Sequence, residues 1–327
     1  MTKRTSLWAL VFAVAALSLW YAVRTHRASA ADSLPDLIEL APAESSMIAY
    51  ADVEALRESP LVQQLAALAQ PTQVDRDYAE FVSETGFDYQ RDLDHVLLTA
   101  GSGATSGKTL IFAEGRFNRQ KIEQYALRSG KLEQENGHAV YVVPSATPGK
   151  DIRFAFLAAG RIALSDGGDV SAAISTSSSA ALDPEMRERL SRVAGAPIFA
   201  AVRASEFTRA VAPNGGRRPG ISTPFESLRW VNLAAKPNGD QVLLSAEGEC
   251  DSADQAQKVA SALELMRGLF RGALADPRAR GRMTAESADA TGKLLDSINI
   301  TTDAVRVRLL VSVTPQMLPP LSAPAGH

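Results

Sequence analysis

Thr109-Leu-Ile-Phe-Ala-Glu-Gly115 and Val242-Leu-Leu-Ser-Ala-Glu-Gly248 are the two stretches that decide the fold of this 327-residue chain. Both read as apolar strands ending in Ala-Glu-Gly, and the second copy of that ending follows the first by 133 residues. A helical pattern follows each stretch. Self-similarity at a fixed shift indicates an internal repeat, so we expect two related units.

The segments before these strands repeat in the same order. Leu93–Leu98 and Leu228–Leu233 match at a shift of 135 residues, and each reads as a strand. Each unit also opens with a strand followed by a helix. The expected ranges are Met47–Asp52 and Val53–Leu68 in the first unit, and Ile198–Arg203 and Ser205–Val211 in the second.

The helices after the Ala-Glu-Gly strands carry clear end signals. Asn118 is a natural N-cap, Phe117 and Ile122 are spaced as a hydrophobic staple, and Gly130 is expected to leave the helix in a left-handed conformation. Asp251 is the expected cap of the second helix. Its apolar positions recur with helical spacing and predict one buried stripe: Ala256, Val259, Ala260, Leu263, Met266 and Phe270.

Hairpin signals complete the predicted architecture. Pro237–Asp240 reads as a tight turn between strands 228–235 and 242–249. A hairpin closes each unit, over His138–Val143 with Ile152–Phe156, and over Ser297–Thr301 with Val305–Val313. The expected fold is therefore α+β, with antiparallel sheets faced by helices. We place the units at 32–195 and 196–314.

The segments between and after these elements read as connectors. Asp183 and Pro184 mark the N-terminus of a short helix, and Gly195 follows its end. The tail over 315–327 contains four prolines and is expected to be unstructured.

Residues 1–31 have the pattern of an export segment. Lys3 and Arg4 precede an apolar run over 7–23, and small residues lead to Ala31. The run is long enough to remain as a transmembrane anchor, with aromatic residues near both of its ends. We expect a single-pass protein of a bacterial inner membrane whose C-terminal domain faces outside the cytoplasm. Cleavage near Ala30, which would release the protein, is the alternative.

The start of the mature region resembles exported bacterial families of unknown function. The resemblance rests on Leu34-Pro35, on Ala41–Glu44, on Ala49–Asp52 and on Leu56-Arg57-Glu58-Ser59-Pro60. These short motifs cover about the first hundred residues. They imply a bacterial envelope setting and no known reaction.

Charge and cysteine content exclude some function classes. Without residues 1–30 the chain has 30 basic against 37 acidic side chains, a formal charge of −7, which argues against nucleic-acid binding. Cys250 is the single cysteine, so the fold has no internal disulfide, and a small buried residue is the expected role.

No motif predicts a cofactor or a metal. The loop over 101–109 resembles a phosphate-binding loop, but its glycine spacing is wrong by one residue and a strand follows it. Asp166-Gly-Gly-Asp169 has too few oxygen ligands for calcium and reads as a turn with a helix cap. The four histidines are far apart, and Gly-x-Ser-x-Gly and Ser-x-x-Lys do not occur.

Two sets of residues remain as candidate sites. The duplicated Glu114 and Glu247 could form a carboxylate pair with one raised pKa for acid-base work, or be solvated strand-end residues. Five arginines could contact anionic lipid headgroups, or belong to a solvated helix end. They are Arg267, Arg271, Arg278, Arg280 and Arg282.

Two functions are therefore expected. The first is an envelope-anchored, non-catalytic interaction or scaffolding domain that presents a sheet face to an unknown protein or polymer. The second is an exported hydrolase whose site is assembled from separate loops. Fold alone does not decide between them.

Overall fold

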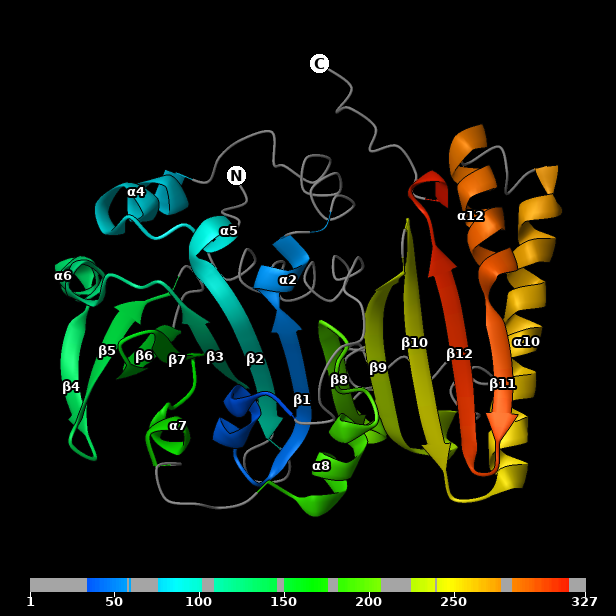
Figure 1. Cartoon of the computed structure of the whole chain (residues 1–327), viewed down its shortest axis with the longest axis horizontal. Coiled ribbons are helices and arrows are strands. Elements are labelled where there is room, and N and C mark those ends of the chain that lie inside the picture. The colour runs from blue at the N-terminus through cyan, green and yellow to red at the C-terminus, as the bar shows by residue number, and fades with distance from the viewer. Residues whose placement is uncertain are drawn as a thin grey trace. The chain divides into compact units, whose positions relative to one another are not determined.

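The computed structural model describes residues 34–57, 59, 76–101, 109–145, 150–175, 182–206, 225–238, 240–277 and 284–317. The chain divides into two compact units, the first built mainly from residues up to Ala200 and the second mainly from Ala201 onward. The predicted export segment and most of the C-terminal tail lie outside the described residues. The α+β class is confirmed, because helices accompany antiparallel sheet in both units (Figure 1).

The first unit is an antiparallel sheet with the strand order β1-β2-β3-β7-β6-β5-β4. Its strands are β1 (Ser45–Asp52), β2 (Leu93–Gly101), β3 (Thr109–Gly115), β4 (Lys131–Glu135), β5 (His138–Pro144), β6 (Asp151–Ala158) and β7 (Arg161–Asp166). Its helices are η1 (Asp36–Leu40), α2 (Val53–Arg57), α4 (Arg76–Thr85), α5 (Tyr89–Asp92), α6 (Arg119–Ser129), α7 (Ser171–Ser175) and α8 (Pro184–Ser191).

Both faces of this sheet are buried. On one face Ile122 and Ala126 of α6 pack in a cluster with Tyr141, Phe154 and Ile162. The alternate strand residues, which point to the opposite face, are also fully buried; they include Leu97, Phe112, Ala155 and Ala163. The apolar strand segments read from the sequence are therefore typical of a sheet covered on two sides.

The second unit contains an antiparallel sheet with the order β9-β10-β12-β11. Its strands are β9 (Leu228–Asn238), β10 (Gln241–Cys250), β11 (Asn299–Asp303) and β12 (Arg306–Val313), and β8 (Ile198–Arg203) crosses the unit boundary. Its helices are η3 (Phe225–Ser227), α10 (Ala253–Ala275), α12 (Ala285–Ser297) and η4 (Pro315–Met317).

The N-terminal half of α10 forms the core of the second unit. Ala256, Val259 and Ala260 pack against Cys250 and Val307. Burial raises the pKa of the Cys250 thiol, because the thiolate would lose its hydration. The expectation that this cysteine is a small buried residue is confirmed.

Several local predictions are confirmed by the structure. Asn118 accepts a hydrogen bond from the Lys121 N–H, and Asp183 accepts one from the Glu185 N–H at the start of α8. Both Ala-Glu-Gly stretches are strands followed by helices. Asn238 and Gln241 pair across the predicted β9–β10 turn.

Other local predictions are wrong. Gly130 leaves α6 with an extended backbone at φ −113°, and a side chain there would collide with the Val142 carbonyl oxygen. Ser252 caps α10 in place of Asp251. Phe270 is 57% exposed, and Leu263 is only partly buried, because the C-terminal half of α10 leaves the core. The sequence patterns do not predict the strands β4 and β7 or the helix α12.

Some predicted elements cannot be compared with the structure. Most of the expected helices over Val53–Leu68 and Ser205–Val211 lies outside the described residues, as do residues 102–108 of the glycine-rich loop.

The two Ala-Glu-Gly glycines differ in what surrounds them. A Cβ atom at Gly115 would collide with the backbone carbonyl of Asp92, whereas one at Gly248 would meet Leu228 Cδ2 at 2.6 Å. A leucine side chain can move aside, and a strand backbone cannot do so without breaking its pairing.

We therefore predict that Gly115→Ala lowers the free energy of unfolding by about 2 to 3 kcal/mol and that Gly248→Ala costs about 1 kcal/mol or less. Urea unfolding of the two variants beside the wild type measures the difference. Equal losses would contradict the assignment of the tight backbone contact to Gly115.

Candidate functional site

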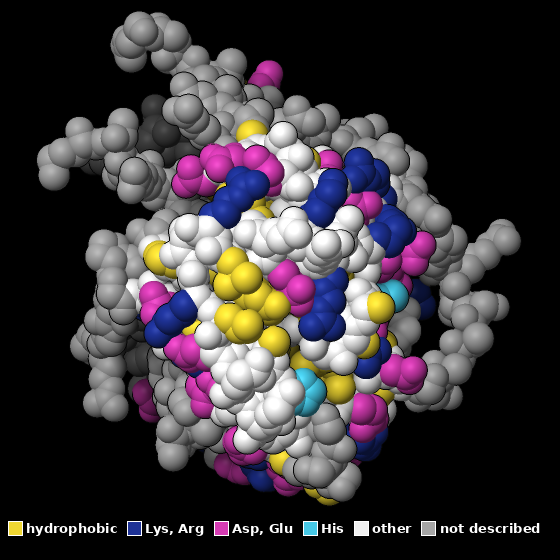
Figure 2. Space-filling model, turned by 90° about the vertical axis from the view of Figure 1, so that its left-hand side faces the viewer, with side chains coloured by type: hydrophobic (Ala, Val, Ile, Leu, Met, Phe, Trp, Pro, Cys, Tyr) yellow, Lys and Arg dark blue, Asp and Glu magenta, His cyan; other side chains and the backbone are white. Residues whose placement is uncertain are grey.

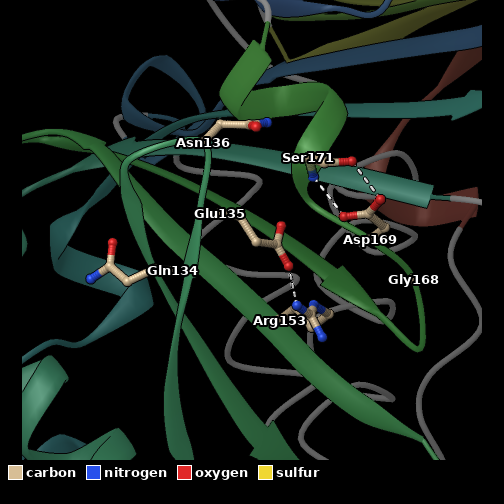
Figure 3. Close-up of a pocket in the computed structure, with 7 residues that line it drawn as sticks. All are labelled: Gln134, Glu135, Asn136, Arg153, Gly168, Asp169 and Ser171. Carbon is tan, nitrogen blue, oxygen red and sulfur yellow. Dashed lines mark hydrogen bonds and ion pairs between the residues drawn. The ribbon is translucent and has the colours of Figure 1, made fainter.

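A polar pocket of about 570 Å³ lies in the first unit, beside the turn between β4 and β5 (Figure 3). Its walls come from the end of β4, from β6 and from the loop between β7 and α7. The lining residues are Gln134, Glu135, Asn136, Arg153, Gly168, Asp169 and Ser171. Its volume falls in the range of small-ligand sites, but its walls lack the apolar side chains that most of those sites contain.

Two tight backbone segments shape this pocket. Asn136 and Gly137 both have positive φ, as an Asn-Gly hairpin turn between β4 and β5 requires. Gly167 also has positive φ and ends β7. Asp169 Oδ1 then accepts a hydrogen bond from the Ser171 N–H at 2.8 Å, so this carboxylate caps α7. The turn with a helix cap predicted for the motif over 166–169 agrees with this bond and with the positive φ of Gly167.

A row of alternating charges on β4 and β6 reaches the pocket wall at Glu135 and Arg153. Lys131 Nζ lies 2.8 Å from Glu133 Oε1, and an Arg153 guanidinium nitrogen lies 2.6 Å from Glu133 Oε2. The same guanidinium group also bonds Glu135. Hydrogen bonds from Lys131 and then from Arg153 hold the pKa of Glu133 below its ordinary value.

Two atoms of this row have no hydrogen-bond partner within the described part of the chain. They are Glu135 Oε2, an acceptor, and Arg153 Nε, a donor, and both are shielded from solvent. Unsatisfied buried polar atoms are rare in folded proteins. A pocket lined by charged and polar groups, two of whose atoms lack a partner, is suited to polar recognition.

A second polar cluster lies on β1, β2 and β3. His95 Nδ1 is 3.2 Å from Glu114 Oε2, and His95 Nε2 is 3.9 Å from Asp52 Oδ1. The ring of Tyr50 stacks on that of His95, with centroids 6.0 Å apart. Burial, and then the charges of Asp52 and Glu114, raise the pKa of Tyr50.

The predicted carboxylates Glu114 and Glu247 each bind an arginine of their own unit. Glu114 Oε1 accepts from Arg161 Nε at 2.8 Å, and Glu247 Oε2 accepts from Arg308 Nε at 2.7 Å. Each arginine is the direct cross-strand neighbour of its glutamate. A carboxylate pair between the two glutamates stays a prediction.

The predicted basic cluster is partly described. Arg267 lies 2.7 Å from Glu264 Oε2 and donates to the Ile298 carbonyl oxygen, and Arg271 pairs with Asp296. Both arginines are therefore engaged with groups of the second unit. Arg278, Arg280 and Arg282 lie outside the described residues.

None of these predicted site residues lines the pocket. Of the residues that line the pocket, only Asp169 belongs to a motif singled out in the sequence, and that motif was interpreted as a turn with a helix cap. Glu135 and Arg153 are separated by β5, so their contact depends on a strand register that the sequence does not reveal. Among the described residues, no group of three His, Cys, Asp or Glu side chains is arranged to hold a metal ion.

Comparison with known proteins gives a likeness of fold. No protein-family model and no curated protein matches the sequence. Crystal form III of TP0453 aligns over 88% of this chain and 97% of its own length, with a TM-score of 0.50 and 9% identity. Crystal form IV of TP0453 aligns over 85% and 93%, with a TM-score of 0.48 and 10% identity. At 9% identity the likeness supports the fold alone.

We predict that Arg153→Met raises the pKa of Glu133 toward 4.5 and lowers the thermal midpoint at neutral pH, because two carboxylates lose their shared cation. A carboxylate with a lowered pKa stabilises the fold above its unfolded pKa and loses that effect as the pH falls. The variant should therefore lose less stability on acidification than the wild type.

Carboxyl-carbon NMR titration measures the Glu133 pKa, and thermal unfolding at several pH values measures stability. Lys131→Met is the control: it should also raise the Glu133 pKa but lower the midpoint by less than Arg153→Met, since Lys131 is 68% exposed and serves only one of the two carboxylates. An unchanged midpoint in Arg153→Met would contradict a structural role for this ion-pair row.

Proposed function

We propose that this chain is an envelope-anchored, non-catalytic interaction or scaffolding domain. In this proposal the apolar run over 7–23 crosses a bacterial inner membrane and the two units face outside the cytoplasm. The basic opening of the chain, the length of the run and its aromatic ends support the proposal. Among the described residues no helix is long and apolar enough to span a membrane.

The observation that carries the non-catalytic part is the way acidic side chains are neutralised. Glu114, Glu247 and Glu133 each bind an arginine on a neighbouring part of the same sheet. The pKa of Glu133 is held below its ordinary value by its hydrogen bonds from Lys131 and Arg153, whereas a general acid or base needs a pKa close to the working pH. The sheets therefore present fixed, paired charges.

The surface of the first unit fits this proposal. Figure 2 shows Lys and Arg side chains interspersed with Asp and Glu side chains, with a small group of hydrophobic side chains among them. Ion pairs such as Arg128–Glu84 and Arg119–Glu123 lie on the helices α4 and α6 of this unit. Mixed charge favours a specific protein or polymer partner over a partner attracted by one sign of charge.

We also infer that the two units arose by duplication. In the first unit β3 lies between β2 and β7, is followed by α6, and pairs with the last strand of the β6–β7 hairpin. In the second unit β10 lies between β9 and β12, is followed by α10, and pairs with the last strand of the β11–β12 hairpin. The Glu–Arg cross-strand pair occurs at the same place in both.

We predict that a C-terminal alkaline phosphatase fusion is active in intact bacteria and that the protein sediments with membranes at its full-length mass. The physical reason is the apolar run, which is long enough to remain in the bilayer. A mature N-terminus at Ala31 would remove the anchor and leave export intact. A cytoplasmic, inactive fusion would contradict export itself.

The second candidate function is an exported hydrolase, and His95 is the observation that favours it. In hydrolase triads one carboxylate orients the general-base histidine through Nδ1, and Glu114 lies 3.2 Å from His95 Nδ1 in this way. If the domain is such an enzyme, the purified protein should cleave chromogenic esters or glycosides, and His95→Gln should lower the rate by about 100-fold or more.

His138→Gln, which changes a histidine on β5, is the matched control and should keep full activity. We expect that the wild type hydrolyses none of these substrates. Hydrolysis that His95→Gln abolishes and His138→Gln does not would favour the enzyme.

A further inference from the structure

The polar pocket beside the β4–β5 turn has the size of a ligand site and not that of a site for one bound water. Holding a single water molecule takes about 10 to 15 Å³, whereas this pocket measures about 570 Å³. That volume is typical of sites for small molecules. The pocket therefore has room for a small ligand or for one unit of a polymer.

The walls of the pocket are held in place by the backbone. Asn136 and Gly137 have positive φ in the tight turn after β4. On the side of β7, a Cβ atom at Gly168 would collide with Ser165 Oγ, so the loop after β7 lies directly on that strand. Walls that are fixed in this way lose little conformational entropy when a ligand binds.

The charges around the pocket are balanced within the protein. Glu135 is bonded to the Arg153 guanidinium group, and both Asp169 carboxylate oxygens accept hydrogen bonds from Ser171 (Figure 3). A strongly charged ligand would have to displace these pairs. The lining also lacks the apolar side chains that a lipid chain or an apolar peptide side chain requires. A neutral ligand rich in hydrogen-bonding groups fits these walls best.

Two neighbouring atoms indicate which hydrogen bonds such a ligand would make. Arg153 Nε is a donor and Glu135 Oε2 is an acceptor, and neither has a partner in the described part of the chain. A hydroxyl group both accepts and donates, so one hydroxyl can join the two. Each side chain is 23% exposed. A turn of the Glu135 carboxylate would bring Oε2, which is shielded from solvent, to the surface of the pocket.

We propose that this pocket binds a neutral saccharide, with one sugar hydroxyl accepting from Arg153 and donating to Glu135. A saccharide carries several hydroxyl groups on a compact ring, which suits a small site with polar walls. The inference rests on the interaction function proposed above and names the class of its partner. Free oligosaccharides and cell-envelope glycans share this chemistry. Weak binding is expected, with a Kd on the order of 1 mM, because the pocket offers no apolar contact.

The test measures binding of cellotriose and chitotriose by saturation-transfer NMR. The full chain is kept in a polyoxyethylene detergent, because a glycoside detergent would itself present sugar hydroxyls. Glu135→Gln is the test variant and Glu133→Gln is its matched control, since both glutamates bond Arg153 and only Glu135 lines the pocket. Glu135→Asp is a second test variant, which keeps the negative charge and withdraws the carboxylate by one methylene group.

We expect at least one trisaccharide to bind the wild type. Glu135→Gln and Glu135→Asp should raise its Kd by about tenfold or more, because a hydrogen bond to a charged group is lost, while Glu133→Gln should change it by less than about twofold. Retention on insoluble cell-wall glycan, reversed by the trisaccharide, would identify a glycan as the source of the ligand. Binding of the trisaccharide alone would identify a free saccharide.

Three results would overturn the proposal. Saturation transfer to neither trisaccharide excludes the saccharide site and leaves a protein as the partner of the interaction domain. Equal losses in Glu135→Gln and Glu133→Gln would assign the effect to the position of Arg153 and not to a contact with Glu135. Tighter binding of spermidine than of either trisaccharide would assign the pocket to a cation.

The same spectra separate this proposal from the function on which it rests. A trisaccharide that binds and stays intact supports both. Cleavage of a bound trisaccharide would keep the saccharide site and overturn the non-catalytic function.

Discussion

The close backbone approach at Gly115 is the constraint on which the first unit depends. The Gly115 N–H donates to the Gly160 carbonyl oxygen, and the next residue, Arg116, donates to the carbonyl oxygen of Asp92. Three segments therefore meet where β3 ends, and no Cβ atom fits between them. This meeting point fixes where the chain leaves the sheet and so sets the position of the N-cap Asn118 and of α6, whose apolar side chains complete the core.

Local signals allowed much of the fold to be predicted from sequence. Strands such as Thr109–Gly115 and caps such as Asn118 and Asp183 depend on a few adjacent residues, and they are found as expected. Gly130 shows where local reasoning fails. A glycine after a helix suggests a left-handed exit, but here the missing side chain is needed for the approach of β5 at Val142. That contact is set by sheet register and cannot be read from adjacent residues.

The candidate sites were harder to predict for the same reason. Glu133 and Glu135 look like ordinary charges of a polar strand until β6 brings Arg153 across β5 to meet them. The paired roles of Arg161 and Arg308 likewise depend on which residue lies opposite Glu114 and Glu247. For α10, helical periodicity correctly gave a buried stripe at Ala256, Val259 and Ala260, but it could not show that the sheet supports only the N-terminal half of the helix.

The charged row on β4 has a consequence for how the protein behaves at high concentration. β4 is the last strand in the order of its sheet, and a terminal strand offers unpaired backbone groups to any other chain in an extended conformation. Lys131, Glu133 and Glu135 place charge along that strand. A second copy that added to this edge in a parallel, in-register arrangement would place Lys131 beside Lys131 and glutamate beside glutamate, so the row disfavours that way of stacking copies edge to edge.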